Sequence, residues 1–206
     1  MTDPKYRIAE LPNAEFYYYP DFLQNHEEIF QWLHQNVQWT QQEGASYGKT
    51  YQEPRKKCIF STKPGTEYTY SAIRATMQPF PEPLEKLRQL LVEKFGVPVN
   101  SCIANLYEDG SRYIARHRDK ETSLVPGMPI LSISLGAVRH FDISCYQPAN
   151  MPNPPHPTHE KVRLDLASGS LVYMGKDSQV YYEHCVPKQL RVKEARINLT
   201  FRVCKE

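Results

Sequence analysis

Alternation of apolar and polar residues is strongest near the end of the chain, in the nine residues from Ala195 to Val203. Every second side chain there is apolar, and the positions between carry Arg196, Asn198, Thr200 and Arg202. Successive side chains of a strand point to opposite faces, so this pattern predicts a strand with one wholly apolar face. Its polar face is either a solvated surface or, through the two arginines, a binding site for a dicarboxylate.

Two segments show the periodicity of helices. Apolar residues recur at four-residue spacing from Ile29 to Val37, after an Asn25–Glu28 pair that predicts a capping box. A second apolar stripe lies within Pro81–Phe95 and is followed by Gly96, a residue that favours the end of a helix. We expect both helices to pack on the core.

Further strands are predicted around Leu131–Leu135 and Val162–Leu166, where apolar residues again occupy every second position. Short alternating strands of this kind indicate a two-sheet sandwich or barrel. The proline-dense segment 147–159 lacks periodicity and is predicted to be an exposed loop. Residues 1–20 are predicted to be a flexible start that docks onto the domain through an edge strand or loop.

Composition is that of an ordinary globular domain. The 206 residues suit one domain with a substantial core, and 40% of them are hydrophobic and 23% charged. The net charge of +2 permits a nucleic acid partner but does not argue for one. Five cysteines without CxxC spacing indicate reduced intracellular thiols, and no apolar run approaches the length of a membrane span.

A His-x-Asp pair, His117 and Asp119, is the strongest sign of chemistry. On extended backbone these two side chains point to the same face, and His184 downstream can supply a third ligand. Two histidines and one carboxylate, with open coordination positions, suit a non-haem Fe(II) that must bind O2 and a co-substrate. Together with the two arginines of the last strand, this set suggests 2-oxoglutarate.

The order and spacing of these motifs resemble the AlkB family of Fe(II)/2-oxoglutarate dioxygenases, specifically its nucleic-acid dealkylase branch, over roughly Trp39 to Val203. The motifs that carry the resemblance are Thr50–Arg55, Tyr68–Ser71, Asn105–Tyr107, Asp109-Gly110, His117-x-Asp119, Pro129–Gly136, His184 and Arg196–Arg202. The resemblance implies an α+β fold with a double-stranded β-helix, or jelly-roll, core, buttressing N-terminal helices and a nucleotide-recognition lid.

The resemblance also implies the roles of the core residues. His117, Asp119 and His184 would bind Fe(II), and O2 and 2-oxoglutarate would be co-substrates. The residues expected to bind 2-oxoglutarate are Asn105, Tyr107, Arg196, Asn198, Thr200 and Arg202. The implied reaction hydroxylates an N-methyl group, as in 1-methyladenine or 3-methylcytosine, and releases formaldehyde.

Substrate contact is expected in residues 39–71, which mix aromatic residues with basic ones, because aromatic rings stack on bases and cations hold phosphates. The alternative for this segment is a tyrosine-rich hairpin that packs on the core. In the family this region forms a lid over the extruded base. The residues expected to bind the substrate are Arg55, Tyr68, Tyr70 and Glu121, the last of these by meeting the exocyclic amine of the base; the alternative for Glu121 is a solvated loop acid. Lys120 departs from the family, whose closest branch has Asp after the metal-ligating Asp.

Two other functions stay open. The chain could be a 2-oxoglutarate oxygenase that modifies a protein or a small molecule with the same core under a different lid. It could also be a catalytically silent nucleic-acid-binding module, although such a module has no need of His117, Asp119 and His184 or of the two arginines. DNA and RNA are both possible substrates; we expect a monomer in the nucleus or cytoplasm.

Overall fold

A computed structural model describes residues 2–8, 10–11, 13–46, 49–65, 67–70, 73–146 and 161–205, with only the backbone described at 44–46, 49–51, 67–70 and 73–75. The predicted proline-rich loop at 147–159 lies outside the described residues. The elements are η1 (Pro4–Tyr6), β1 (Phe16–Tyr19), α1 (His26–Asn36), β2 (Thr40–Ser46), β3 (Lys49–Ser61), β4 (Glu67–Tyr70), β5 (Ile73–Thr76), β6 (Gln78–Pro79), α2 (Glu82–Phe95), β7 (Ser101–Tyr107), β8 (Ile114–His117), β9 (Ile130–Gly136), β10 (Arg139–Cys145), β11 (Lys161–Leu166), β12 (Leu171–Met174), α3 (Ser178–Tyr181), β13 (Tyr182–Val186) and β14 (Arg196–Arg202).

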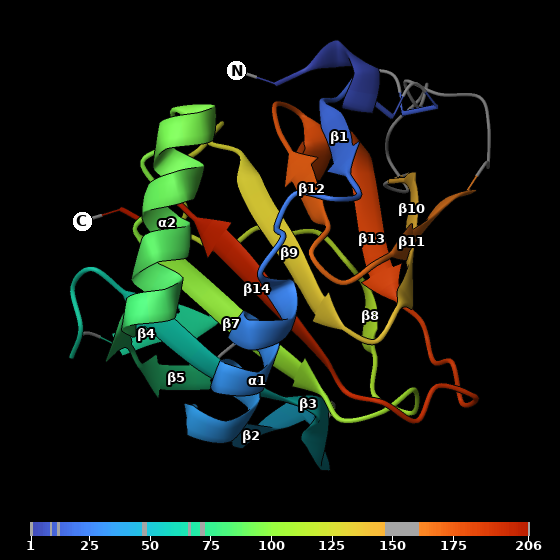
Figure 1. The fold of residues 1–206 in the computed structure, drawn as a ribbon. Helices are drawn as coiled ribbons and strands as arrows, with labels where there is room; N and C mark the ends of the chain where they lie inside the picture. Colours follow the sequence, from blue (N-terminus) through green and yellow to red (C-terminus); the bar gives the residue numbers. More distant parts are fainter. Residues whose placement is uncertain are drawn as a thin grey trace.

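The strands form two facing sheets and a separate hairpin (Figure 1). The larger, eight-stranded sheet has the order β1-β12-β9-β14-β7-β3-β2, with β6 pairing to β3 in parallel. The smaller sheet has the order β11-β10-β13-β8, and β4 pairs with β5. The sandwich is antiparallel apart from β6, which confirms the predicted α+β jelly-roll fold.

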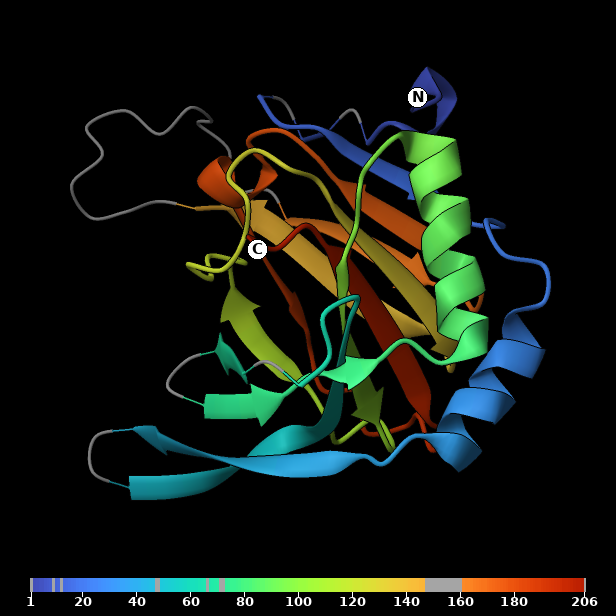
Figure 2. The same ribbon diagram turned by 90° about the vertical axis from the view of Figure 1, so that its left-hand side faces the viewer.

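Helices α1 and α2 lie on the outer face of the larger sheet, and the smaller sheet faces its other side (Figure 2). The buried side chains of α2 are Leu84, Leu87 and Leu91, and Gly96 ends that helix in the left-handed conformation, as predicted. No helix in the described part of the chain is long and apolar enough to cross a membrane.

The capping box predicted for α1 is wrong. Asn25 is the N-cap residue, but its side chain makes no capping hydrogen bond. Its φ of −88° and ψ of 31° differ from the extended conformation from which an N-cap side chain reaches the first turn. The helix instead depends on packing, since Ile29 and Leu33 are buried in the core.

Strand β14 lies at the centre of the larger sheet, between β9 and β7. All seven of its residues are buried, so its polar face is not the solvated surface that the alternative interpretation required. One face packs in the core cluster that includes α1 and α2, through Ile197, Leu199 and Phe201. The other face, with the arginines, lines a cavity between the two sheets.

Arg139, the first residue of β10, joins two loops. Its guanidinium is fully buried and donates to Gln189 Oε1 (3.1 Å) and to the backbone oxygens of Asp109, Arg112 and Pro187 (3.0, 2.8 and 2.8 Å). The two loops approach so closely that a Cβ added at Gly110 would lie 1.7 Å from the Gln189 oxygen. This close approach explains why the second residue of the Asp109-Gly110 motif has no side chain.

We therefore expect Gly110→Ala to lower the free energy of unfolding by about 3 kcal/mol, as overpacking does at a site that cannot relax. Gly127→Ala is the control, because its Cβ would meet open space and only its φ of +78° opposes a side chain, at about 1 kcal/mol. Urea unfolding of both variants measures the difference. Equal losses would contradict a steric requirement at Gly110.

Candidate active site

Two antiparallel neighbours of the smaller sheet bring the predicted histidines together. His117 on β8 pairs directly with His184 on β13, and their ring centroids are 4.4 Å apart. Residues opposite each other on one sheet face have adjacent side chains, so this register places both imidazoles on the inner face. His184 is buried and packs against Phe141, with 5.2 Å between the ring centroids.

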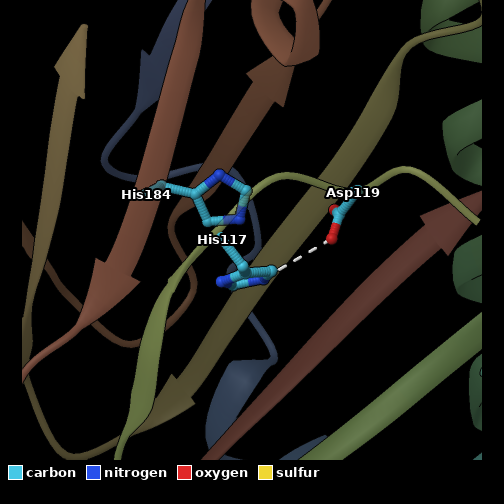
Figure 3. Close-up of side chains that lie close together, drawn as sticks. All are labelled: His117, Asp119 and His184. Carbon is cyan, nitrogen blue, oxygen red and sulfur yellow. Dashed lines mark ion pairs between the residues drawn. The ribbon is translucent and has the colours of Figure 1, made fainter. Parts of the chain in front are cut away.

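Asp119 completes the cluster from the loop that follows β8. Its Oδ1 lies 3.5 Å from His117 Nε2, and the ligand atoms of His117, Asp119 and His184 all lie within 4.8 Å of one another (Figure 3). The Asp119 backbone N–H donates to Gln179 Oε1 (2.8 Å), and Arg202 Nη2 lies 3.2 Å from Asp119 Oδ1. The loop is therefore held from α3 and from β14.

The protonation states leave these atoms able to bind a cation. His117 Nδ1 lies 2.9 Å from the Ala115 oxygen, which fixes that nitrogen as the donor and leaves Nε2 as the acceptor. Burial and the neighbouring His117 lower the pKa of His184 to about 3, so its ring is neutral. Burial opposes ionisation of Asp119, but Arg202 and both histidines outweigh it and hold the pKa of Asp119 below its usual range.

Two imidazoles and one carboxylate form a donor set that suits Fe(II) with open coordination positions. Asp119 Oδ1 is buried and accepts no hydrogen bond from a described residue, although it forms an ion pair with Arg202. The geometry therefore fits the metal that the sequence suggested.

The cavity between the sheets is lined on its far side by three neighbouring strands. Alternate residues of β14, β7 and β3 face into it, and the pairing places Asn198 beside Asn105 and Asn105 beside Lys57. The lining includes the three members of the His/Asp cluster and all six residues predicted to bind 2-oxoglutarate: Asn105, Tyr107, Arg196, Asn198, Thr200 and Arg202.

Arg196 is the clearest anion-binding group in this cavity. Its side chain is buried, its Nη2 donates to Ser134 Oγ (2.9 Å), and its Cζ lies 5.2 Å from the centre of the Tyr107 ring. Its Nε and Nη1 have no hydrogen-bond partner among the described residues. Burial lowers the pKa of Arg196 to about 10, so it stays charged at neutral pH. A carboxylate of a ligand would accept hydrogen bonds from these unused donors and neutralise the buried charge.

Arg202 and Glu121 form a pair that the sequence did not predict. Arg202 Nη1 donates to Glu121 Oε1 at 2.6 Å, and both side chains are about 5% exposed. The alternative of a solvated loop acid at Glu121 is therefore wrong. Glu121 also lies outside the lining of the main cavity, and Arg202 joins it to Asp119.

The basic residues of the segment 39–71, where substrate contact was expected, are divided by the alternation of side chains along β3. Lys56–Ser61 pair with β7 within the larger sheet. Arg55 and Lys57 face the cavity and are buried, whereas Lys56 points away and pairs with Glu108 (2.6 Å). The aromatic Phe60 belongs to the core and stacks on Phe80. Only part of the segment 39–71 is therefore free to act as a lid.

Two hairpins remain for that role. Figure 2 shows β2–β3 extending beyond the sandwich, with β4–β5 beside it, and β2 contacts β5. Tyr68 and Tyr70 lie on β4, and their side chains are outside the described part of the structure.

Three contributions to the site were not predicted from the sequence. Gln179 holds the Asp119 backbone, Ser134 holds Arg196, and Glu53 pairs with Lys57 at 2.5 Å. The first two contacts join segments far apart in the sequence, so no local spacing reveals them, whereas Glu53 and Lys57 lie four residues apart on β3. The alternation of Glu53 and Lys57 with Arg55 was the available hint of a shared face.

Comparison with known proteins matches residues 15–202 to the family described as the 2OG-Fe(II) oxygenase superfamily. The chain is 36% identical to mouse DNA oxidative demethylase ALKBH2 over 179 residues, covering 85% of this chain and 74% of that protein. Human ALKBH2 is 34% identical, with 85% and 67% covered. Human alpha-ketoglutarate-dependent dioxygenase alkB homolog 3 is 35% identical, with 89% and 64% covered.

Among solved structures, that of OsALKBH1 has the same fold. It superposes with a TM-score of 0.60 at 19% identity and covers 94% of this chain and 98% of that one. At this identity the match supports the fold and nothing more specific.

Proposed function

Since this chain belongs to the AlkB family within the 2OG-Fe(II) oxygenase superfamily, we propose that it demethylates N-alkylated bases of nucleic acid by oxidation, in direct-reversal repair. The observation that carries the proposal is the arrangement of one cavity, with the His/Asp/His cluster on one wall and the unsatisfied Arg196 on the other. The nucleic acid substrate is supported by the relatives that are named DNA oxidative demethylases.

The cofactors of the family are Fe(II) and 2-oxoglutarate, with O2 as co-substrate. We assign His117, Asp119 and His184 to the metal, whose bound form supplies O2 activation and oxidation of the methyl group. Arg196 would bind one carboxylate of 2-oxoglutarate through its free Nε and Nη1. Each of these groups is held by a second contact, which preserves its orientation without ligand.

The remaining polar residues of the cavity would orient the co-substrate. Asn105 and Tyr107 on β7 and Asn198 and Thr200 on β14 line the cavity beside Arg196. Asn198 is fixed by donating to Ser132 Oγ and to the Ile133 oxygen, and Thr200 donates to Asn198 Oδ1. Arg202, at the other end of β14, would meet the second carboxylate of 2-oxoglutarate, and it also pairs with Asp119 and Glu121.

The substrate base would reach this cavity from outside the stack, because an N-methyl group on a pairing edge is inaccessible within a duplex. We assign the lid to the β2–β3 hairpin and to the β4–β5 hairpin, whose β5 (Ile73–Thr76) extends past the predicted segment 39–71. Tyr68 and Tyr70 would contact the base, and Glu121 is kept as a group near the substrate. Loss of the hydroxylated methyl group as formaldehyde would restore the base. A monomer that acts on DNA, RNA or both, in the nucleus or cytoplasm, accords with this proposal.

The test is a mass-spectrometric assay of short oligonucleotides that carry 1-methyladenine or 3-methylcytosine, as single and double strands of DNA and RNA. With Fe(II), 2-oxoglutarate and O2, we expect loss of one methyl group and release of formaldehyde, and no reaction with His184→Ala. If 2-oxoglutarate is consumed while every oligonucleotide keeps its methyl group, the nucleic acid substrate is contradicted, and the alternative of a protein or small-molecule substrate is tested next. If 2-oxoglutarate does not bind, the oxygenase assignment itself fails.

A further inference from the structure

Three charged residues follow one another on the inner face of β3. Glu53, Arg55 and Lys57 occupy alternate positions, and their side chains are 5 to 9% exposed. Glu53 Oε2 lies 2.5 Å from Lys57 Nζ, and Glu53 Oε1 lies 3.8 Å from Arg55 Nη2. Buried charges are costly unless they are paired, so this row is a built feature of the cavity wall.

Arg55, the middle residue of this row, contacts Asn105, which we assigned to the co-substrate. Arg55 Nε donates to Asn105 Oδ1 at 3.0 Å, between two buried side chains. An asparagine amide has an acceptor end and a donor end, and only the donor end suits a carboxylate. Because Arg55 takes the acceptor end, the Nδ2 group is left for another partner, and it donates to no described residue.

We propose that Arg55 is a positioning residue for 2-oxoglutarate, which locks the Asn105 amide with its Nδ2 donor toward the co-substrate, while Glu53 and Lys57 hold Arg55 in place. The inference rests on the proposed function only in taking 2-oxoglutarate as the ligand of this cavity. This role replaces the contact between Arg55 and the nucleic acid that we expected from the sequence.

The charges of the row suit this task. Arg55 and Lys57 carry two positive charges against one on Glu53, so the wall has a positive excess that favours a dianion. Burial and the nearby Arg55 lower the pKa of Lys57 to about 8, although Glu53 opposes the shift. Lys57 therefore compensates Glu53 at neutral pH, and Arg55 remains available to Asn105.

Burial separates this role from a phosphate contact. A residue that binds the sugar–phosphate backbone must reach the surface, whereas the Arg55 side chain is 6% exposed. Lys56, the next residue, shows the contrast because its side chain is 33% exposed and pairs with Glu108.

The decisive variant is Arg55→Lys, which keeps the charge but loses the planar donor that meets Asn105. Affinity for 2-oxoglutarate is measured by calorimetry on the Mn(II)-loaded protein without nucleic acid. We expect it to fall about tenfold, as for the loss of one hydrogen bond to a charged group. Arg55→Met, which brings no charge into the wall, gives the same measurement if the lysine variant does not fold.

A double-mutant cycle tests whether the effect passes through Asn105. If it does, Asn105→Leu with Arg55→Lys binds 2-oxoglutarate no more weakly than Asn105→Leu alone, because both changes remove one contact. In turnover, KM for 2-oxoglutarate should rise in Arg55→Lys by a larger factor than KM for the oligonucleotide. Additive losses would indicate that Arg55 acts independently of Asn105 and would overturn the proposal.

Lys56→Met is the matched control, since it lies on the same strand and faces away from the cavity; its affinity for 2-oxoglutarate should equal that of the parent. Unchanged affinity in Arg55→Lys, with a raised KM for the oligonucleotide, would return Arg55 to the nucleic acid. Binding is measured without nucleic acid, so a parent protein that binds 2-oxoglutarate but demethylates no base contradicts the proposed function and not this inference.

Discussion

We expect His117→Ala, Asp119→Ala and His184→Ala each to abolish turnover and metal binding while the domain stays folded. The three ligand atoms lie within 4.8 Å of one another, and the loss of any one leaves two ligands for the metal. The fold should survive because none of the three residues belongs to the two large core clusters, although His184 packs against Phe141 of one of them. In Asp119→Ala, Arg202 also keeps Glu121 as a partner.

Metal binding is measured directly by titrating Mn(II) into each variant and following the free ion by electron paramagnetic resonance. The smaller sheet offers a matched control pair, His140 and Asp165, whose Nδ1 and Oδ1 atoms are 2.6 Å apart on its exposed side. His140→Ala and Asp165→Ala should bind metal like the parent. If one of the three variants binds Mn(II) as tightly as the parent, the residue changed in that variant is not a metal ligand.

The second large effect is expected for a substitution of Arg196. It should leave the protein without 2-oxoglutarate as stable as the parent or more stable, but it should weaken the binding of 2-oxoglutarate. Arg196→Met removes a buried cation that has no carboxylate partner among the described residues, so the protein without 2-oxoglutarate should unfold at the same temperature or higher. With 2-oxoglutarate, the carboxylate loses its buried partner at about 3 kcal/mol, roughly a hundredfold in affinity.

Thermal unfolding with and without 2-oxoglutarate, together with calorimetry, measures both effects. The parent should gain stability from the co-substrate and Arg196→Met should gain almost none, because a ligand stabilises only in proportion to its occupancy. Arg163→Met is the control, since that arginine pairs with Asp142 on the exposed side of the smaller sheet. An equal shift of the unfolding temperature in Arg196→Met and the parent would remove Arg196 from the co-substrate site.

Strands and helices followed from local pattern, because their side-chain periods are properties of the backbone. The period-two segment became β14, and the stripe ending at Gly96 became α2. The predicted His117 and Asp119 do lie together, but β8 ends at His117 and Asp119 reaches the cluster from the following loop. Capping at Asn25 failed because it depends on a backbone angle that residue types alone do not set.

The sequence by itself therefore determined the elements of the sandwich and named the His/Asp/His cluster and the arginines of β14. Only the tertiary structure decided what each polar group faces. Pairing of β14 between β7 and β9 turned a strand that looked amphipathic into a buried one. It also placed Glu121 against Arg202, and Arg55 against Asn105. These contacts join residues 81 and 50 positions apart, and sheet register, which arises from the packing of the whole core, brings them together.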